Sequence, residues 1–391
     1  MIPILKDMTL EAKRVFLRVD YNVPLHGNQV GEAHRIDSTL PTLNFILARA
    51  KTVLLASHLG RPGGKRDPQY SLEPVRAYLQ SKLSQPVILA PDCIGADVER
   101  LAAIAANRII LLENLRFHPE EEANEVEFCR ALAALADVYV NNAFGAAHRA
   151  HASVSGMVRF FRAKGMGLLM QKEVDYLARL LSSPQRPFVA VLGGAKVSDK
   201  IGVIHNLLPK LDALLVGGGM AYTFLRTENV PVGKSLVEEK QLAVAKDVLA
   251  RAQAMRLPLL LPSDHVVAQE VKGSDPAETV SVIPADKMGL DIGPGTAAEY
   301  AAKLSAAKLV LWNGPMGVFE EERFFSGTRA VASALAASKA VSIVAGGDTV
   351  AAVRLAGVED KISHLSTGGG ATLEFLEGKK LPGIEALETN S

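Results

Sequence analysis

Short apolar runs recur along the chain, each followed by a loop containing Gly or Pro and then by a segment with helical spacing. The runs are nearly continuous in Val, Ile and Leu, which is typical of strands buried on both faces. Because such strands alternate with helices, the pattern predicts parallel sheets in a doubly wound α/β fold. The predicted strands begin the segments RVFLRVDYNVP, TVLLASHLGRP, RIILLENLRFHPE, DVYVNNAFGAAHRAH, PFVAVLGGAKVSDK, ALLVGGGMAYTF, KLVLWNGPMGVF, VSIVAGGDTVAAV and ISHLSTGGGATLEF.

A different pattern separates the two halves of the chain. In GLLMQKEVDYLARLLSSPQRP the apolar residues recur at helical spacing, and Ser182-Ser183-Pro184 ends the pattern. We interpret residues 168–185 as a helix that connects two domains; an ordinary helix within one large domain is the alternative. A length of 391 residues favours two domains. The predicted domains are residues 1–167 and residues 186–377.

Composition excludes several classes of function. Lys and Arg total 43 against 42 Asp and Glu, so a net charge of +1 gives no bulk attraction to nucleic acid or membrane, and an anion site must be local. Two cysteines, Cys93 and Cys129, make no disulfide framework and no zinc set of their own, and we expect them to be buried small hydrophobes. The sequence shows no signal peptide and no membrane-spanning run, which predicts a cytoplasmic, reduced location.

Basic side chains follow the predicted strands of the first half. The carboxyl ends of parallel strands share one edge of a sheet, where ligands bind. A lone loop arginine is more often a solvated charge, but several at one edge cost free energy unless an anion compensates. Because the guanidinium fork suits phosphate and carboxylate, we predict a small anionic substrate. The candidates are Asp20, Asn22, Arg35, His58, Arg61, Arg116, His148, Arg149 and His151.

Two other polar clusters in the first half have simpler interpretations. His148 and His151 could suggest a metal, but no nearby carboxylate or cysteine completes a zinc set. The three glutamates at 120–122 follow Pro119, and we expect them at the start of a solvated helix.

Glycines follow the predicted strands of the second half. They let a ligand approach the backbone, and the helix start that follows supplies N–H groups for phosphate oxygens. One such loop could be a plain tight turn, whereas four in one domain predict a nucleotide site. Neither G-x-x-x-x-G-K-[ST] nor G-x-G-x-x-G occurs, which disfavours a Walker loop and, without excluding it, an NAD enzyme. The loops are Gly193-Gly194, Gly217-Gly218-Gly219, Gly346-Gly347 and Gly368-Gly369-Gly370.

Three charged residues lie beside these glycines. Lys196 and Lys200 are four residues apart at a predicted helix start, so we expect them on one helical face. Asp348 could hold Mg²⁺ against the phosphates, or it could cap the helix that it begins. The pattern predicts a phosphate site whose cradle is shared among several loops.

Eight motifs in order across nearly the whole chain make it resemble phosphoglycerate kinases: RVDYNVP, SHLGRP, ENLRFH, AHRAH, LGGAKVSDKI, WNGPMGVFE, GGDT and STGGGA. The resemblance implies two Rossmann-like domains joined by a hinge helix, in a monomer. The N-terminal domain would bind 3-phosphoglycerate or 1,3-bisphosphoglycerate, and the C-terminal domain MgATP or MgADP. It also implies that residues 378–391 return to the N-terminal domain.

The resemblance also implies residue roles. The substrate-binding residues would be Asp20, Tyr21, Asn22, Arg35, His58, Leu59, Gly60, Arg61, Arg116 and Arg149. The nucleotide-binding residues would be Lys196, Lys200, Gly217, Gly218, Gly289, Asn313, Glu320, Gly346, Gly347, Asp348 and Thr349. Within the nucleotide-binding set, Asp348 would bind Mg²⁺ and Glu320 would hold the ribose. The catalytic residues would be Arg35, Lys196, Gly346 and Gly369.

The implied reaction passes a phosphoryl group reversibly between 1,3-bisphosphoglycerate and ADP, in glycolysis and gluconeogenesis. Its carboxylate nucleophile is already ionised near neutral pH, so no general base is needed. Domain closure, alignment and charge stabilisation would supply catalysis. An anion-binding protein without chemistry, another acyl-phosphate kinase and an NAD enzyme are the alternatives.

Overall fold

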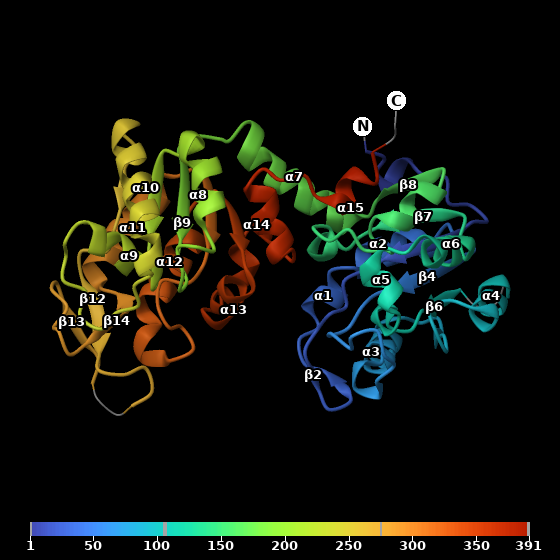
Figure 1. Ribbon diagram of the computed structural model, residues 1–391. Helices are drawn as coiled ribbons and strands as arrows, with labels where there is room; N and C mark the ends of the chain where they lie inside the picture. The colour runs from blue at the N-terminus through green and yellow to red at the C-terminus, as the bar shows by residue number, and fades with distance from the viewer. Residues whose placement is uncertain (1, 105–107, 274–275, 389–391) are drawn as a thin grey trace. The chain divides into compact units, whose positions relative to one another are not determined.

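The computed structural model describes residues 2–104, 108–273 and 276–388. The chain divides into two compact units: unit 1 is Met1–Asp175 with Lys380–Ser391, and unit 2 is Tyr176–Lys379. The division falls inside helix α7 (Leu168–Ser182). Each unit has its own parallel sheet with helices on its faces (Figure 1). The predicted α/β class with two parallel sheets is therefore confirmed.

The sheet of unit 1 has the strand order β5-β6-β4-β1-β7-β8, with every pair parallel. Its strands are β1 (Arg14–Arg18), β4 (Thr52–Ala56), β5 (Val87–Leu89), β6 (Ile109–Leu111), β7 (Val138–Asn141) and β8 (Ala163–Met166). The helices are α1 (His34–Asp37), α2 (Leu40–Leu47), α3 (Glu73–Lys82), α4 (Ala96–Ala103), α5 (Pro119–Ala123), α6 (Val126–Ala134) and α15 (Pro382–Glu385). Short 3₁₀ helices are η1 (Leu5–Asp7), η2 (Pro68–Tyr70), η3 (Leu115–Phe117), η4 (Phe144–Ala146) and η5 (Gly156–Phe160), and a hairpin pairs β2 (Leu25–His26) with β3 (Gln29–Val30).

The C-terminal segment belongs to unit 1 by direct contacts. The Gly383 N–H donates to the Ala147 carbonyl at 2.8 Å, and the Asn141 amide donates to the Gly383 carbonyl at 3.3 Å. The Lys164 ammonium donates to the carbonyl of Ala386 at 2.9 Å. These bonds hold α15 beside the carboxyl end of β7 and the strand β8.

The sheet of unit 2 has the order β11-β10-β9-β15-β16-β17, also parallel throughout. Its strands are β9 (Phe188–Leu192), β10 (Ala213–Val216), β11 (Leu259–Leu260), β15 (Leu309–Asn313), β16 (Val341–Ala345) and β17 (His364–Leu365). Its remaining helices are α8 (Ile201–Leu207), α9 (Met220–Thr227), α10 (Leu242–Ala254), α11 (Pro294–Ala306), α12 (Ser326–Ala337), α13 (Gly347–Leu355), α14 (Gly370–Leu376), η6 (Leu208–Lys210), η7 (Glu239–Gln241), η8 (Glu322–Phe324) and η9 (Glu359–Lys361). A separate antiparallel sheet joins β12 (His265–Ala268), β13 (Glu278–Val280) and β14 (Met288–Ile292).

All of the strands predicted from the apolar runs are present, and the missed strands of the large sheets share one property. The strands β5, β8 and β11 all lie at sheet edges, and each is only partly buried. An edge strand has one neighbour, so it needs no long apolar run. Among the described residues, none of the helices combines the length and the apolar character needed to cross a membrane.

Candidate active site

Each parallel sheet has one point where the strand order reverses direction, and ligands bind in the crevice at such a point. In unit 1 the reversal lies between β1 and β7, and in unit 2 between β9 and β15. The loops after these strands and after the neighbouring strands β4, β10 and β16 carry most of the predicted site residues. Each unit therefore presents its own candidate site.

In unit 1, hydrogen bonds join three of the loops at this edge. Arg35, on α1, donates from Nη1 to Asp20 Oδ2 at 3.1 Å and to the Asn22 carbonyl at 3.2 Å. The Gly60 N–H donates to Asn22 Oδ1 at 2.9 Å, and Arg116 Nη1 donates to the Gly60 carbonyl at 2.8 Å. The structure thus brings together predicted residues that follow β1, β4 and β6.

A buried histidine lies among the cations of this site. His58 is only 4% exposed, and its Nδ1 lies 3.4 Å from Arg18 Nη2. Because a guanidinium can only donate, Nδ1 must accept, which leaves the ring proton on Nε2. Burial first, and then Arg18, Arg116, Arg149 and His151, hold the pKa of His58 well below its usual value. The lowered pKa favours the uncharged ring near neutral pH, and its Nε2–H can donate to an anion.

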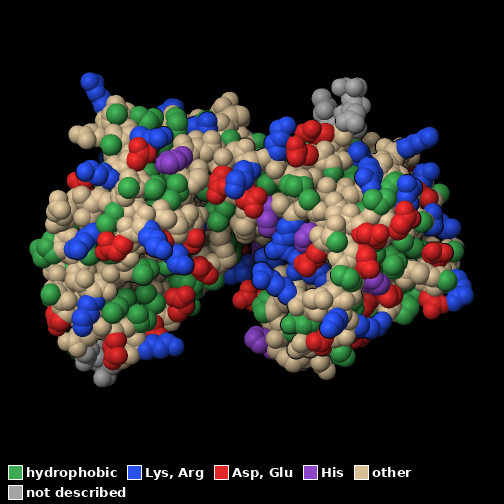
Figure 2. Space-filling model, viewed as in Figure 1, with side chains coloured by type: hydrophobic (Ala, Val, Ile, Leu, Met, Phe, Trp, Pro, Cys, Tyr) green, Lys and Arg blue, Asp and Glu red, His purple; other side chains and the backbone are tan. Residues whose placement is uncertain are grey.

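Burial and the same neighbouring arginines also lower the pKa of His151, to about 4. The Arg149 Nε lies 3.3 Å from His148 Nε2, after η4. Lys, Arg and His side chains gather together on the visible face of unit 1 (Figure 2). Gathering cations this closely favours an anionic ligand.

Two of the predicted substrate-binding residues are engaged within the protein. Tyr21 is fully buried, and its hydroxyl shares a 2.9 Å hydrogen bond with Thr39. Leu59 is 3% exposed, and its N–H and carbonyl both bond the side-chain amide of Asn114. These residues shape the loops, whereas Arg61 lies exposed on the loop after β4.

Sequence reasoning missed the residues beneath this site. Arg18 Nε donates to Ser153 Oγ at 2.7 Å, and Ser153 donates to Glu121 from Oγ at 2.6 Å and from its N–H at 2.9 Å. All three residues are at most 1% exposed. The prediction that the glutamates at 120–122 begin a solvated helix is wrong for Glu121, because its carboxylate meets these donors in the interior. The available signal was Arg18 itself, a charge inside an apolar strand.

In unit 2, a cavity of about 400 Å³ lies beside the glycine loops. Of the predicted nucleotide-binding residues, Gly218, Gly289, Glu320 and Asp348 line it. Its remaining wall includes apolar side chains that sequence reasoning did not single out: Leu236, Val271, Met288, Leu290, Val318 and Phe319. A largely apolar cavity lined by two carboxylates suits a ligand that combines an apolar group with hydroxyl or other hydrogen-bond donors.

Close backbone packing explains one of these glycines. Gly218 has φ +65°, and a Cβ on it would lie 2.6 Å from both N and O of Gly194 and 2.9 Å from the Pro315 carbonyl oxygen. The loops after β9, β10 and β15 therefore meet backbone to backbone, and no side chain fits between them.

A second group of predicted residues lies at the carboxyl ends of β15 and β16. The Lys200 ammonium donates to Asn313 Oδ1, and the Asn313 amide donates to the Ala345 carbonyl at 2.8 Å. The hydroxyl of Thr349 accepts from Gly314 N–H at 2.7 Å. Burial lowers the pKa of Lys200, although Asp199 and Asp348 oppose the shift.

Two of the predicted helix starts, those of α13 and α14, lie directly after glycine loops. Gly346 precedes α13, whose first turn holds the exposed residues Gly347 and Asp348. Gly369 precedes α14, in the loop that follows the neighbouring strand β17. Gly217 directly follows β10, and its N–H donates to the carbonyl of Leu192, the last residue of β9, at 2.8 Å.

The prediction that Lys196 and Lys200 share a helical face is wrong. Helix α8 begins at Ile201, so both lysines precede it. Val197 is fully buried, and Ser198 bonds Glu238 through both its N–H and its hydroxyl, at 3.1 and 2.7 Å. These tertiary contacts hold an irregular loop in which Lys196 is exposed. It follows that only three of the four glycine loops lead directly into a helix.

Comparison with known proteins identifies the family. The family model described as phosphoglycerate kinase matches residues 5–379. The chain belongs to the phosphoglycerate kinase family. A phosphoglycerate kinase from Anaeromyxobacter sp. (strain K) is 55% identical over 389 residues, which cover 97% of this chain and 98% of the relative. The one from Moorella thermoacetica is 54% identical and covers 98% of both chains.

Solved structures agree with this assignment. The phosphoglycerate kinase structure from Coxiella burnetii matches with a TM-score of 0.90 and 41% identity, covering 99% of both chains. The one from Pyrococcus horikoshii OT3 has a TM-score of 0.85 and 33% identity, covering 99% of this chain and 98% of the other. The resemblance to phosphoglycerate kinases and the prediction of a kinase are confirmed.

In this phosphoglycerate kinase family member, a buried carboxyl lies directly behind the cavity of unit 2. Asp291, on β14, is 1% exposed and accepts from the N–H groups of Ile292 at 2.9 Å and Gly327 at 2.6 Å. A Cβ on Gly317, which lines the cavity, would lie 2.4 Å from Asp291 Oδ1. Burial raises the pKa of Asp291 to about 7.

Asp291→Asn should remove a pH dependence of stability. Because the folded pKa lies above the unfolded value, the group stabilises the fold fully below about pH 4, and this contribution is lost as pH rises through about 7. Across that window the unfolding free energy of the wild type should fall relative to the variant by about 1.4 kcal/mol per pH unit. Urea unfolding at several pH values measures this. The exposed Asp360→Asn serves as control, and curves for Asp291→Asn parallel to the wild type would contradict the assignment.

Proposed function

We propose that this chain catalyses reversible, Mg²⁺-dependent phosphoryl transfer between 1,3-bisphosphoglycerate and ADP, giving 3-phosphoglycerate and ATP. The observation that carries the proposal is the cation cluster of unit 1, in which buried His58 lies 3.4 Å from Arg18 and in the electrostatic field of Arg116 and Arg149. A small, highly charged anion suits this cluster. Membership of the phosphoglycerate kinase family favours phosphoglycerate as that anion. We further propose that the protein acts as a cytoplasmic monomer.

The proposed roles in unit 1 follow from the donors at the sheet edge. Arg61, Arg116 and Arg149 supply positive charge for phosphate, and His58 donates from Nε2. Asp20 and Asn22 hold Arg35 in place and are proposed to accept from substrate hydroxyls.

In unit 2 we propose that the adenine enters the apolar cavity and that Glu320 accepts from the ribose hydroxyls. Lys196, Lys200 and the N–H groups at the start of α13 would hold the phosphates. Asp348 fits a magnesium ligand, because it is an exposed carboxylate that lines the cavity, and Mg²⁺ prefers one or two carboxylates with phosphate oxygens. The ion, when bound, would offset phosphate charge.

The chemistry then needs alignment rather than a base. The attacking carboxylate of 3-phosphoglycerate is ionised near neutral pH, because its pKa is about 4. Arg35, Lys196 and the helix starts at Gly346 and Gly369 are proposed to stabilise the charge on the transferred group. Since the two sets of residues belong to different units, we propose that the units close during transfer and exclude water.

Phosphorus NMR of the protein with MgATP and 3-phosphoglycerate tests the proposal. ADP and acyl-phosphate signals should appear, and both should be absent without magnesium or in Lys196→Ala. If ATP stays intact while 3-phosphoglycerate still binds, the chain is an anion-binding protein and the catalytic assignment fails.

A further inference from the structure

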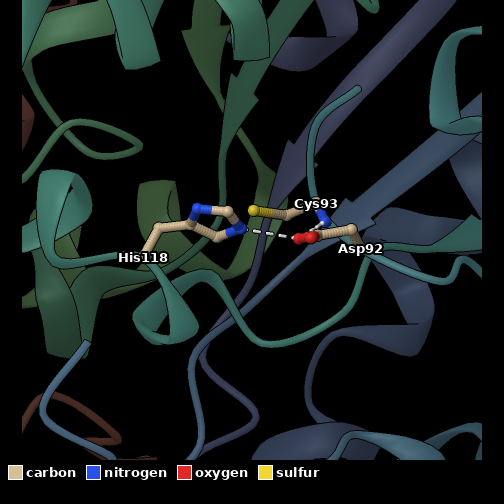
Figure 3. A group of neighbouring side chains, drawn as sticks. All are labelled: Asp92, Cys93 and His118. Atoms are coloured by element: carbon tan, nitrogen blue, oxygen red, sulfur yellow. Dashed lines mark hydrogen bonds and ion pairs between the residues drawn. The ribbon is translucent and has the colours of Figure 1, made fainter. Parts of the chain in front are cut away.

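Three side chains of different chemistry meet in unit 1 at a place that the proposed function does not use. Asp92 and Cys93 follow β5, and His118 lies between η3 and α5. Figure 3 shows the three side chains pointing toward one another. Their carboxylate oxygen, Sγ and ring nitrogen lie within 4.8 Å of one another. Within the described ranges of the chain, no other group of three such side chains is this close.

The donor set selects a class of ligand. A thiolate is soft, an imidazole is borderline and a carboxylate is hard, and Zn²⁺ accepts all three in four-coordinate sites. Mg²⁺ prefers oxygen ligands alone, so a site that contains Cys93 would not favour it. The cluster is therefore distinct in kind from a magnesium site at Asp348.

Exposure gives the cluster an open side. Cys93 is fully buried, whereas the His118 and Asp92 side chains are 25% and 40% exposed. A cation could thus enter past His118 and Asp92, reach the thiol at the bottom and keep water as a fourth ligand. We propose that Asp92, Cys93 and His118 bind a thiophilic divalent cation, with Zn²⁺ as its representative.

Protons compete with the cation at each ligand. His118 Nε2 and Asp92 Oδ1 share a 2.7 Å hydrogen bond, which raises the pKa of His118, and burial raises the pKa of the Cys93 thiol. Binding forms Zn–S and Zn–N bonds and releases the thiol proton, together with a second proton wherever His118 is protonated. Affinity should therefore rise with pH.

The location ties the cation to the anion site. His118 directly follows η3, the turn that contains Arg116, and directly precedes the first residue of α5. A cation held by His118 and by the Asp92-Cys93 loop would fix that turn to the end of β5. Its binding should accordingly raise the melting temperature of the protein.

Calorimetric titration of the full chain with Zn²⁺, in excess Mg²⁺ to occupy oxygen-only sites, tests the proposal. We expect one Zn²⁺ per chain, and with Co²⁺ a thiolate charge-transfer band in the near ultraviolet. Cys93→Ser and His118→Gln should each weaken binding at least about 10-fold, since even outer-shell partners of metal ligands contribute 10–100-fold. Melting in EDTA verifies that each variant is folded.

Two matched variants separate this cluster from other ligands in unit 1. Cys129→Ser removes the other buried thiol, and His151→Gln removes one of the two histidines, His148 and His151, that lie three residues apart in unit 1. Both variants should bind Zn²⁺ as the wild type does. The proposal is overturned if the wild type binds no Zn²⁺ at micromolar concentration. It is equally overturned if folded Cys93→Ser keeps the wild-type affinity, or if His151→Gln loses it.

Discussion

Arg35→Ala should lower kcat by about 10³-fold or more while changing the KM for 3-phosphoglycerate far less. Arg35 bonds Asp20 and Asn22 only through Nη1, and its side chain stays 36% exposed. The rest of the guanidinium can therefore donate to the transferred group. Arg116 and Arg149, the other proposed substrate-binding arginines, are unchanged in this variant, so ground-state binding should largely persist.

Steady-state kinetics with both substrates varied measures this split. Arg130→Ala is a suitable control, because Arg130 is exposed in the same unit and pairs only loosely with Glu127, at 3.5 Å. Arg35→Lys should recover only part of the rate, since an ammonium keeps the charge but lacks the planar fork. A variant with full kcat and a raised KM would show that Arg35 binds substrate without stabilising the transition state.

The sequence predicted the centre of each sheet and the loops at its carboxyl edge. Central strands such as β4 and β7 are buried on both faces, so they must be apolar without interruption. The short edge strands β5 and β11 have no such requirement, and they were missed. Residues directly after a central strand, such as Asp20 and His58, follow from the topology alone.

What the sequence could not predict depends on contacts between distant segments. The spacing of Lys196 and Lys200 fits a helix locally, yet the bonds from Ser198 to Glu238 hold a loop instead. The apolar wall of the cavity in unit 2 includes Leu236, which lies in an irregular segment between α9 and η7. No periodic pattern marks such residues, because the cavity is assembled only by the tertiary fold.

The hydrogen-bonded side chains of Arg18, Ser153 and Glu121, which lie beneath the candidate anion site, also come from distant segments of the chain. We expect Glu121→Ala to destabilise the protein by about 3–5 kcal/mol. The carboxylate of Glu121 accepts both the N–H and the hydroxyl of Ser153, and Ser153 in turn accepts from Arg18. Removing it leaves the Ser153 N–H without its acceptor and the Arg18 charge uncompensated in the interior. Burial raises the pKa of Glu121, and the Arg18 charge opposes that shift.

Urea unfolding measures this cost, with Glu127→Ala as the matched control. Glu127 pairs with Arg130 at the surface, where the side chains are 77% and 59% exposed, so its loss should cost less than about 1 kcal/mol. Glu121→Gln should lie between the two, because it keeps an acceptor for Ser153 but removes the negative charge.

Glu121→Ala should also weaken the binding of 3-phosphoglycerate, through its effect on His58. Arg18 contacts both Ser153 Oγ and His58 Nδ1, so freeing the guanidinium should also free the ring that it orients. The KM for 3-phosphoglycerate should therefore rise in folded Glu121→Ala, whereas Glu127→Ala should keep the wild-type KM.

If Glu121→Ala unfolds at the same urea concentration as Glu127→Ala, the chain from Glu121 to Arg18 contributes no net stability. An unchanged KM in the folded variant would mean that His58 is held by the surrounding packing and not by Arg18.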